Sequence, residues 1–295
     1  MTHKQLRFAI FGNEYQARKS AGVKTLLDYL LNRHAEVYID RSYADFLMKR
    51  ESLPLDGCQV FDGDDFVADY VVSMGGDGTF LKAASRVGEK QIPIFGVNMG
   101  RLGFLADVLP SEIEQMLDAV YEGDYKTESR SVIQIETEGE TVLGSPYALN
   151  DIAVLKRDNA SMISIQTTID NDYLVTYQAD GLVVSTPTGS TAYSLSNGGP
   201  ILVPQSGNIC LTPVAPHSLN IRPIVINDQS VITLRVVSRS HNFLVAIDGR
   251  SQKLRETTTV TIRKAPFETQ IIKRPRHRYF STLREKMMWG LDQRD

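Results

Sequence analysis

The sequence predicts two domains of different class: an α/β domain with a parallel sheet, followed by an all-β domain. Strand-like and helix-like segments alternate as far as residue 125, which is the pattern that builds a parallel sheet. Over residues 130–271 the chain is instead rich in Val, Ile and Thr, with several stretches of period-two hydrophobicity. A helical spacing returns near the carboxyl end, and we expect this C-terminal helix to pack back on the first domain. The expected boundaries are 1–125, joined by 275–295, for the α/β nucleotide-binding domain and 126–274 for the β-rich domain.

The elements of the first domain follow from short apolar runs and from longer helical spacings. Short β-rich runs predict strands at 7–11, 36–39, 70–74 and 92–97. Apolar residues three and four positions apart predict helices at 14–34, 43–50, 80–86 and 111–121. We expect Ser111 and Glu114 to form a capping box at the start of the last of these helices. In such a sheet, ligands gather at the carboxyl ends of the strands.

The second domain is predicted from alternation and from turn residues. Alternating hydrophobic residues indicate strands at 132–136, 164–169 and 231–237, and a further strand is expected at 182–184. Residues 170–172 and 138–139 have the composition of hairpin turns. A short helix is expected at 191–197, and the C-terminal helix at 279–289.

Composition limits the classes of protein that this chain can belong to. The chain has 295 residues and a net charge of −3, with 32 Lys and Arg against 35 Asp and Glu, so no global basic field favours nucleic acid. No run of 18 apolar residues is present, which argues against a membrane span. The two cysteines, Cys58 and Cys210, form neither a disulfide framework nor a metal-binding pattern. We therefore expect a soluble protein of the cytoplasm that binds neither nucleic acid nor membrane.

The most informative motif is Gly75-Gly-Asp-Gly-Thr79, which lies between the strand at 70–74 and the helix at 80–86. A strand that runs through glycines into a helix brings backbone N–H groups and a helix N-terminus to one point, which suits a phosphate. Asp77 stands within this motif, and a carboxylate in an anion site points to proton removal or metal binding. The combination predicts phosphoryl transfer. Locally, a tight turn with Asp77 as the helix N-cap explains the same residues about equally well.

Two further segments have polar side chains where strands begin or end. Ser185-Thr-Pro-Thr-Gly-Ser-Thr-Ala-Tyr193 follows the strand at 182–184, and its hydroxyls suit either an ordinary turn or the polar edges of a ligand. Asn150-Asp151 precedes an apolar run, and an amide beside a carboxylate suits a ribose or an adenine as well as a turn. The chain has no P-loop, no GxGxxG, no HExxH and no GxSxG motif, which disfavours a P-loop enzyme, a dehydrogenase and a serine hydrolase.

Taken together, these segments resemble the NAD kinase family of the GGDGT-type kinase superfamily, over nearly the whole chain. The motifs occur in the order of that family: the Gly75–Thr79 motif, Asn98-x-Gly-x-Leu-Gly-Phe-Leu105, Asn150-Asp151, Asp180-Gly181, the segment from Ser185 to Tyr193, and Pro216-His217. The resemblance implies ATP-dependent phosphorylation of the adenosine 2′-hydroxyl of NAD, which gives NADP. It implies that Asp77 is the catalytic residue that accepts the hydroxyl proton.

The resemblance also implies a set of substrate-binding residues. They are Gly75, Gly76 and Gly78 for the dinucleotide phosphates, with Lys82 as a further phosphate partner, and Asn150, Asp151, Asp180, Thr191, Ala192, Tyr193, Ser194, Leu195, Ser196 and Ala215 for the nucleotides. ATP and NAD are then the substrates, a divalent metal ion such as Mg²⁺ bridges the ATP phosphates, and the assembly is a homo-oligomer, either a dimer or a tetramer. The metal ligands are unassigned.

Two positions depart from the family pattern. The family usually has Asn-Glu where this chain has Asn150-Asp151, and it often has Gln where this chain has Arg250. Two other functions are kept as alternatives: a lipid or sugar kinase of the same superfamily, and a non-catalytic dinucleotide sensor.

Overall fold

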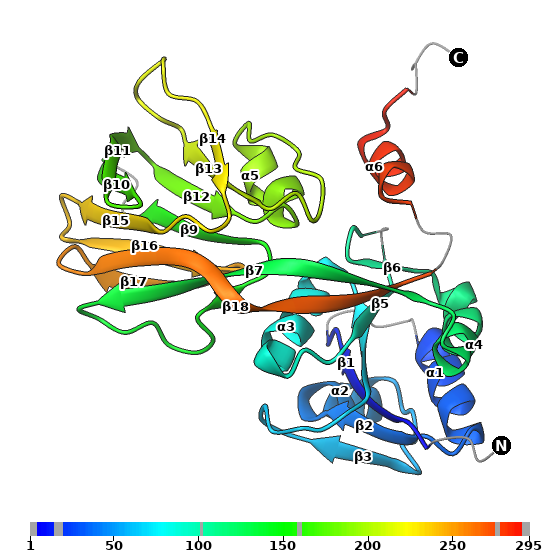
Figure 1. Cartoon of the computed structure of the whole chain (residues 1–295). Helices are drawn as coiled ribbons and strands as arrows, with labels where there is room; N and C mark the ends of the chain where they lie inside the picture. The colour runs from blue at the N-terminus through cyan, green and yellow to red at the C-terminus, as the bar shows by residue number, and fades with distance from the viewer. Residues whose placement is uncertain (1–4, 15–19, 101–102, 158–160, 275–277, 291–295) are drawn as a thin grey trace. The chain divides into compact units, whose positions relative to one another are not determined.

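The computed structural model describes residues 5–14, 20–100, 103–157, 161–274 and 278–290 of the chain (Figure 1). It divides into two compact units, one formed by Met1–Glu128 with Gln270–Asp295 and the other by Ser129–Thr269. The predicted fold class is confirmed: the first unit is α/β with a parallel sheet, and the second is built mostly from antiparallel strands.

The first unit is organised around five parallel strands. They are β1 (Arg7–Gly12), β2 (Glu36–Asp40), β3 (Cys58–Phe61), β4 (Tyr70–Gly75) and β5 (Ile94–Asn98). Their order is β3-β2-β1-β4-β5, so β1 has β2 on one side and β4 on the other. The order reverses between β1 and β4, and such a reversal opens a crevice at the carboxyl ends of the two strands. A short strand, β6 (Ala106–Val108), also pairs with β5.

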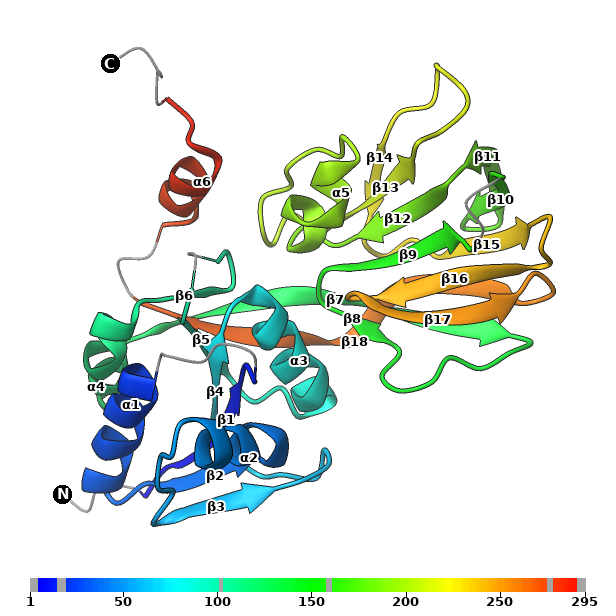
Figure 2. The same ribbon diagram turned by 180° about the vertical axis from the view of Figure 1, so that it is seen from behind.

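Helices cover this sheet and bury its apolar side chains. They are α1 (Ser20–Asn32), α2 (Arg41–Arg50), α3 (Asp77–Val87) and α4 (Ile113–Glu122), with 3₁₀ turns at Gly88–Lys90 and Pro110–Glu112. Helices α1 and α4 lie side by side, as the two opposite views show (Figure 2). One apolar cluster joins α1, α2 and α4 to the strands, with Leu26, Leu30 and Leu47 among its fully buried members. Helix α3 packs on β4, β1 and β5.

Two helices begin later than the sequence suggests. The helix expected at 14–34 is observed as Ser20–Asn32, with Glu14 in a turn and residues 15–19 outside the described part of the chain. The helix expected at 111–121 begins at Ile113, because Pro110 opens a 3₁₀ turn instead. The prediction of a capping box between Ser111 and Glu114 was wrong. Instead, the Glu112 carboxylate accepts the Leu109 N–H at 2.9 Å.

The second unit is a sandwich of two antiparallel sheets. One sheet has the order β14-β13-β12-β9-β16-β17, and the other places β11, β10, β15 and β18 side by side. The strands are β7 (Lys126–Glu138), β8 (Tyr147–Ala148), β9 (Asp151–Lys156), β10 (Ile163–Ile169), β11 (Asp172–Ala179), β12 (Gly181–Ser185), β13 (Asn208–Val214), β14 (Ile224–Asn227), β15 (Ile232–Val237), β16 (Asn242–Ile247), β17 (Arg250–Arg255) and β18 (Thr259–Lys273). The chain passes between the units within β7 and β18.

Alternation of side chains explains how this sandwich is filled. Ile232, Leu234 and Val236 are buried, whereas Thr233 and Arg235 between them are more exposed. The buried residues of both sheets join one core cluster. Between β10 and β11 the turn expected at 170–172 is present, with φ of 51° at Asp170 and 68° at Asn171, the left-handed conformation of a tight hairpin.

The second unit is not purely β. A 3₁₀ turn (Gly189–Thr191) and the short helix α5 (Tyr193–Ser196) follow β12. The C-terminal helix α6 (Tyr279–Met287) belongs to the first unit, where Leu283 is buried and the Lys286 ammonium lies 4.7 Å from the Phe104 ring. This contact agrees with the expectation that the helix packs back on the first domain.

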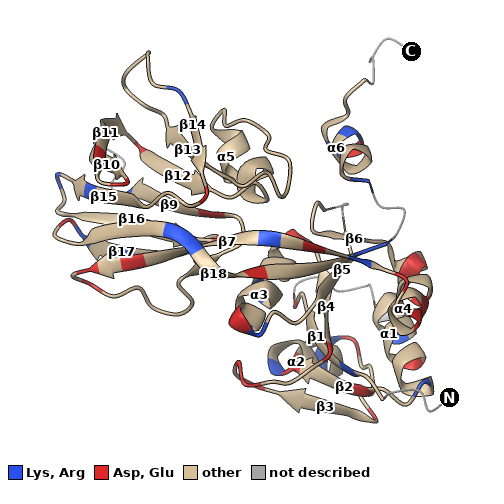
Figure 3. Cartoon of the chain, viewed as in Figure 1, with Lys and Arg blue, Asp and Glu red and all other residues tan. Residues whose placement is uncertain are grey.

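Charge and hydrophobicity are spread over both units. Acidic residues recur along α4, and Lys and Arg are scattered over several elements (Figure 3). Among the described residues, no helix is both long and apolar enough to cross a membrane.

Candidate active site

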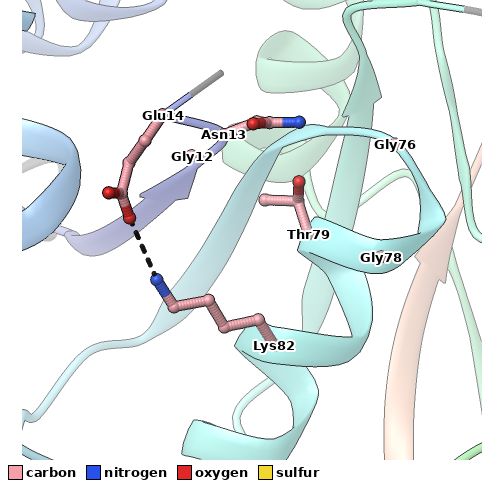
Figure 4. Close-up of a pocket in the computed structure, with 7 residues that line it drawn as sticks. All are labelled: Gly12, Asn13, Glu14, Gly76, Gly78, Thr79 and Lys82. Atoms are coloured by element: carbon pink, nitrogen blue, oxygen red, sulfur yellow. Dashed lines mark hydrogen bonds and ion pairs between the residues drawn. The ribbon is translucent and has the colours of Figure 1, made fainter. Parts of the chain in front are cut away.

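A pocket of about 290 Å³ lies at the carboxyl ends of β1 and β4, where the strand order reverses. Its lining comes from the turn after β1 and from the start of α3: Gly12, Asn13, Glu14, Gly76, Gly78, Thr79 and Lys82 (Figure 4). Three of the predicted phosphate-binding residues, Gly76, Gly78 and Lys82, are therefore brought together in one pocket. Helix α3 presents its N-terminus here, and that end of a helix favours anions.

The glycines of the motif are present for two different reasons. A Cβ on Gly75 would lie 2.2 Å from Thr79 Oγ1, so this glycine is required by the packing of the turn itself. A Cβ on Gly76 or Gly78 would meet no atom within 4 Å. Neither of these two residues has a positive φ, so the fold does not require glycine at either position. Their missing side chains instead leave the pocket open.

Replacing Gly78 by Ala is expected to separate binding from stability. Alanine inside a helix stabilises by about 0.5–1 kcal/mol relative to glycine, so the melting temperature should not fall. The new methyl group would occupy the pocket, and we expect the KM for the nucleotide whose phosphates bind there, NAD or ATP, to rise about tenfold, which is ~1.4 kcal/mol of binding free energy. Steady-state kinetics and thermal unfolding check this result.

Ser85→Ala is the matched control, because it makes a similar gain in helix propensity on α3 outside the pocket lining. Unchanged KM values for both NAD and ATP in Gly78→Ala would show that the open space at Gly78 is not used by the phosphates.

Lys82 points across this pocket toward Glu14 (Figure 4). Its ammonium lies 3.5 Å from Glu14 Oε1, 3.2 Å from Ser42 Oγ and 3.9 Å from Asp40 Oδ2. Nearly half of the Lys82 side chain is exposed, whereas Asp40 is buried. The ammonium is thus held near the pocket by acidic groups and can turn toward an incoming phosphate.

Asp77 is the first residue of α3, but it is not among the residues that line the pocket. Its carboxylate accepts three backbone N–H groups: from Phe104 to Oδ2 at 2.9 Å, and from Leu105 and Ala106 to Oδ1 at 3.0 Å each. It is not the N-cap, which is Gly76 without a side-chain cap bond. The expectation that Asp77 is the helix N-cap is therefore wrong.

Gly103 makes room for this arrangement. A Cβ on Gly103 would lie 1.9 Å from Asp77 Oδ1, so a larger residue there would displace the carboxylate. A carboxylate has about four lone-pair positions, of which the three N–H bonds occupy three. The oriented carboxylate retains one position that can accept a hydroxyl proton.

The second unit has its own polar cluster at the start of β9, around Asn150 and Asp151. The Asp248 carboxylate accepts the backbone N–H groups of Leu149 at 2.8 Å, Asn150 at 2.8 Å and Asp151 at 3.1 Å. The Asp248 N–H in turn donates to the Asp151 carbonyl at 3.0 Å, with φ of 46° at Asp248. Asp248 thus fixes the backbone of the Asn150-Asp151 pair.

Two polar side-chain atoms of this cluster lack hydrogen-bond partners. Asn150 Oδ1 and Ser185 Oγ are buried and have no hydrogen-bond partner. Burial raises the pKa of Asp151 to about 7, and the nearby Asp248 charge contributes in the same direction. Burial also raises the pKa of Asp248, against the three N–H donors that lower it. Buried polar atoms without partners are costly, so this cluster is suited to the polar groups of a ligand.

Replacing Asp151 by Asn is expected to change how stability depends on pH. Because the pKa of Asp151 is about 7 in the folded chain, against an ordinary value of 3.8, the folded state binds more protons than the unfolded state between those values. The free energy of unfolding should therefore fall as pH rises from 4 to 7, and Asp151→Asn should lack that part of the decline. We expect the variant to gain stability relative to the wild type between pH 5 and pH 8. Thermal unfolding over this range measures the effect, and parallel pH dependences of the two proteins would contradict it.

The segment from Thr186 to Ser194 packs against the same cluster. Strand register places Ser185 opposite Asp151, and a Cβ on Gly189 would lie 2.0 Å from the Asn150 carbonyl oxygen. Ser194 Oγ lies 2.8 Å from Thr212 Oγ1 and is fully buried, whereas Tyr193 is partly exposed. The predicted residues Asn150 and Asp151 are thus beside the start of the predicted 191–196 segment.

Asp180 and Ala215 lie at the other end of β12. Asp180 forms an ion pair with Lys156 at 2.7 Å, and Ala215 has φ of 43°. Asp180 and Ser185 are five positions apart along extended chain, which is ~16 Å at 3.3 Å per residue. The predicted nucleotide residues of this unit therefore fall into two groups.

Arg250, which departs from the family pattern, lies on β17 with its guanidinium donating to the Ser145 carbonyl at 3.1 Å. Its side chain is exposed, and the nearby Asp248 rather than Arg250 holds Asn150-Asp151.

The sequence reasoning missed several residues. Asn13 and Glu14 follow the end of the first strand, which is a ligand-binding position of the same kind as the end of the strand at 70–74, and that signal points to them. Asp248 acts through hydrogen bonds to residues far away in the chain, and Gly103, although part of the motif at 98–105, acts by leaving room for the distant Asp77 carboxylate, so no local pattern points to either role.

No group of three or more His, Cys, Asp or Glu side chains that could hold a metal ion is found in the described part of the chain. Glu14 is the carboxylate among the pocket-lining residues, and the oxygens of Asp77 are engaged by N–H groups. These residues fit a metal ion that is carried by the phosphates of a nucleotide, which is how Mg²⁺ is commonly bound.

A parallel sheet, a glycine-lined pocket at its strand-order reversal and an oriented Asp after two glycines define a nucleotide-dependent phosphotransferase of the GGDGT class. Family models agree: residues 9–125 match the ATP-NAD kinase N-terminal domain, and residues 149–274 match the ATP-NAD kinase C-terminal domain. The chain belongs to the NAD kinase family, as the sequence predicted.

Individual relatives support this assignment. The NAD kinase of Bacteroides fragilis is 57% identical over 289 residues, which cover 98% of this chain and 100% of that protein. The NAD kinase of Porphyromonas gingivalis is 44% identical over 96% of this chain and 98% of its own length. The predicted enzyme activity, ATP-dependent NAD kinase, is confirmed by these matches, and the alternative of a lipid or sugar kinase is not retained.

Solved structures match over the whole fold. Yeast NADH kinase complexed with NADH has a TM-score of 0.88 at 22% identity, over 98% of this chain and 89% of that one. An NAD kinase from Archaeoglobus fulgidus in complex with ATP has a TM-score of 0.73 at 25% identity, over 96% of this chain and 99% of that one.

Proposed function

We propose that the chain makes NADP with the pocket at β1 and β4 as its phosphate site and Asp77 as its general base. This proposal rests on an observation at Gly76 and Gly78. A Cβ at either position would meet no other atom within 4 Å, and neither residue has a positive φ that would require glycine. Phosphate oxygens need close approach to backbone N–H groups, and two open positions at a helix N-terminus allow it. Lys82, 3.5 Å from Glu14, supplies a positive charge that can leave its acidic partner for a phosphate.

Asp77 accepts the proton of the adenosine 2′-hydroxyl as that oxygen attacks the γ-phosphorus of ATP. The P–O bond to the leaving ADP breaks in line with the new bond, and the proton is taken up by the carboxylate. The three N–H donors from Phe104, Leu105 and Ala106 keep the carboxylate in one orientation, with one lone-pair position left to accept the proton. Holding a reacting group in a fixed orientation lowers the entropic part of the barrier.

The second unit supplies NAD-binding residues. We assign the ribose and adenine contacts to Asn150 and Asp151, because their polar atoms are buried beside unpartnered oxygen atoms. The segment Thr191, Ala192, Tyr193, Ser194, Leu195 and Ser196 supplies further nucleotide contacts. Asp180 and Ala215, at the other end of β12, are assigned to a more distant part of the dinucleotide.

A divalent ion such as Mg²⁺ would be held by the phosphates of ATP rather than by a cluster of side chains. It neutralises the charge of the phosphates when bound, and Glu14 is the side chain best placed to contact it from the pocket wall. We also propose a cytoplasmic enzyme that assembles as a homo-oligomer.

The test is to follow NADP formation with an NADP-specific dehydrogenase after incubating the purified chain with NAD, ATP and Mg²⁺. We expect a signal that requires all three components and that disappears when EDTA is added. Binding of NAD without turnover, with ATP or polyphosphate and with Mg²⁺ or Mn²⁺, would instead support the alternative of a dinucleotide sensor.

A further inference from the structure

Asp77 is oriented by the segment 104–106, so whatever holds that segment in place also determines where the carboxylate points. The segment leads into β6, which lies close to β5: a Cβ on Gly96 would be 2.7 Å from the Ala106 Cα. The Gly103 N–H donates to the Ala106 carbonyl at 3.2 Å and closes the turn. These contacts fix one side of the segment.

The other side is held by Lys273, the last residue of β18. Its ammonium lies 2.8 Å from Asp107 Oδ2 and 3.5 Å from the Leu105 carbonyl oxygen. The side chains are 1% and 8% exposed for Lys273 and Asp107 respectively. This is a buried ion pair, 166 residues apart in the sequence, directly behind the segment that binds Asp77.

Leu105 connects the two sets of bonds. Its N–H donates to Asp77 Oδ1 at 3.0 Å, while its carbonyl oxygen faces Lys273. Asp107 is bound by the same ammonium, and it directly follows Ala106, whose N–H also donates to Asp77 Oδ1. A shift of Lys273 would therefore move the donors of the carboxylate.

Packing alone does not explain why an ion pair is buried at this position. Removing two charges from water costs about as much as their attraction returns, and a well-packed apolar pair of similar volume is often at least as stable. An apolar pair would fill the same space, but it would provide no hydrogen bond to hold the Leu105 carbonyl oxygen at a fixed point.

We propose that Lys273 and Asp107 are positioning residues for the kinase reaction: they fix the segment 104–106, whose N–H groups orient Asp77. This inference rests on the proposed role of Asp77 as the general base. Lys273 and Asp107 do not contact the substrates in this proposal. They act through the peptide groups of Leu105 and Ala106.

The test compares the removal of both charges with single substitutions of Lys273, all in the full chain. The double variant Lys273→Met with Asp107→Leu replaces both charges by apolar groups, so it should keep a melting temperature near that of the wild type. We expect its kcat to fall at least tenfold while the KM values for NAD and ATP change less than twofold. Lys273→Gln, which keeps an N–H donor for the Leu105 carbonyl, should retain more of the wild-type kcat than Lys273→Met.

The matched control is the ion pair between Lys264 and Asp228, at 2.7 Å, in which Asp228 is buried and Lys264 is partly buried. The double variant Lys264→Met with Asp228→Leu should leave kcat unchanged, whatever it does to stability. Hydrogen exchange of the wild type and of Asp107→Asn gives a second readout that needs no apolar variant. In Asp107→Asn, the N–H groups of residues 104–106 should lose protection selectively.

Asp77→Asn in the same series distinguishes the two proposals. If Asp77→Asn is inactive and the Lys273→Met, Asp107→Leu protein is fully active, the positioning role is wrong and the general base stands. If Asp77→Asn itself is active, the general base is wrong. If both proposals are correct, adding Asp77→Asn to the double variant should lower kcat no further than Asp77→Asn alone. The reason is that Asp77, Lys273 and Asp107 would act as one unit. Unchanged protection at 104–106 in Asp107→Asn would also overturn the positioning role.

Discussion

Turnover should fall about 10²–10⁴-fold when Asp77 is replaced by Asn, because removal of a general base typically has an effect of this size. The Asn oxygen can still accept the N–H groups of Leu105 and Ala106. Its amide NH₂ then faces the Phe104 N–H, where the wild type has an acceptor at 2.9 Å. One hydrogen bond is lost, and we expect a decrease of ~1–3 kcal/mol in the free energy of unfolding.

The coupled NADP assay measures turnover, thermal unfolding measures stability, and calorimetry measures binding of NAD and ATP. Both substrates should still bind, since Asp77 does not line the phosphate pocket. The Lys273→Met, Asp107→Leu protein is the control, because it disturbs the segment and keeps the carboxylate. Its loss of turnover should be smaller than that of Asp77→Asn. Turnover of Asp77→Asn within twofold of the wild type would exclude proton removal by this residue.

Arg86→Met should produce the second large effect, a decrease of ~2–4 kcal/mol in the free energy of unfolding. The guanidinium forms an ion pair with the buried Asp40 at 3.0 Å, and it also contacts Asp64 and the Gly63 carbonyl. It lies 5.5 Å from the Phe11 ring as well. Removing it leaves the Asp40 carboxylate with a weaker set of partners in a buried position.

The same variant should weaken ATP binding although Arg86 does not line the pocket. Lys82 is 3.9 Å from Asp40 Oδ2, and without Arg86 the Asp40 carboxylate, left with Lys82 as its cation, should draw the Lys82 ammonium away from the phosphates. We expect a severalfold higher KM for ATP, and Asp40→Asn combined with Arg86→Met should restore it. Kinetics and thermal unfolding provide the readouts.

Arg41→Met is the matched control for charge removal, because the Arg41 and Asp62 side chains are 56% and 75% exposed. Exposed pairs contribute less than about 1 kcal/mol, so this variant should change neither stability nor KM appreciably. A normal KM for ATP in Arg86→Met would show that Asp40 does not influence Lys82.

The prediction of fold class succeeded because it depended on local geometry. Alternation at Ile232, Leu234 and Val236 follows from the two-residue repeat of a strand, which holds wherever the strand is placed. The turn at Asp170 and Asn171 succeeded for the same reason, since tight hairpins require residues that accept positive φ. Helix starts were less accurate, as Pro110 and the turn at Glu14 show.

The candidate site was predicted in part. The glycines and Lys82 lie close together along the chain, so the strand-to-helix pattern was enough to group them. Glu14 joins them from 68 residues away, and this required the order in which β1 and β4 pair. Local patterning contains no information on that order.

The sequence by itself determined the class of each domain, the family, and the residue types available for phosphate and nucleotide binding, because these depend on short-range backbone geometry and on motif spacing. Only the tertiary structure decided what Asp77 contacts, that Asp248 holds the backbone of Asn150, and that Lys273 lies behind Leu105. These bonds join residues 28, 98 and 168 positions apart, so packing of whole elements brings them together.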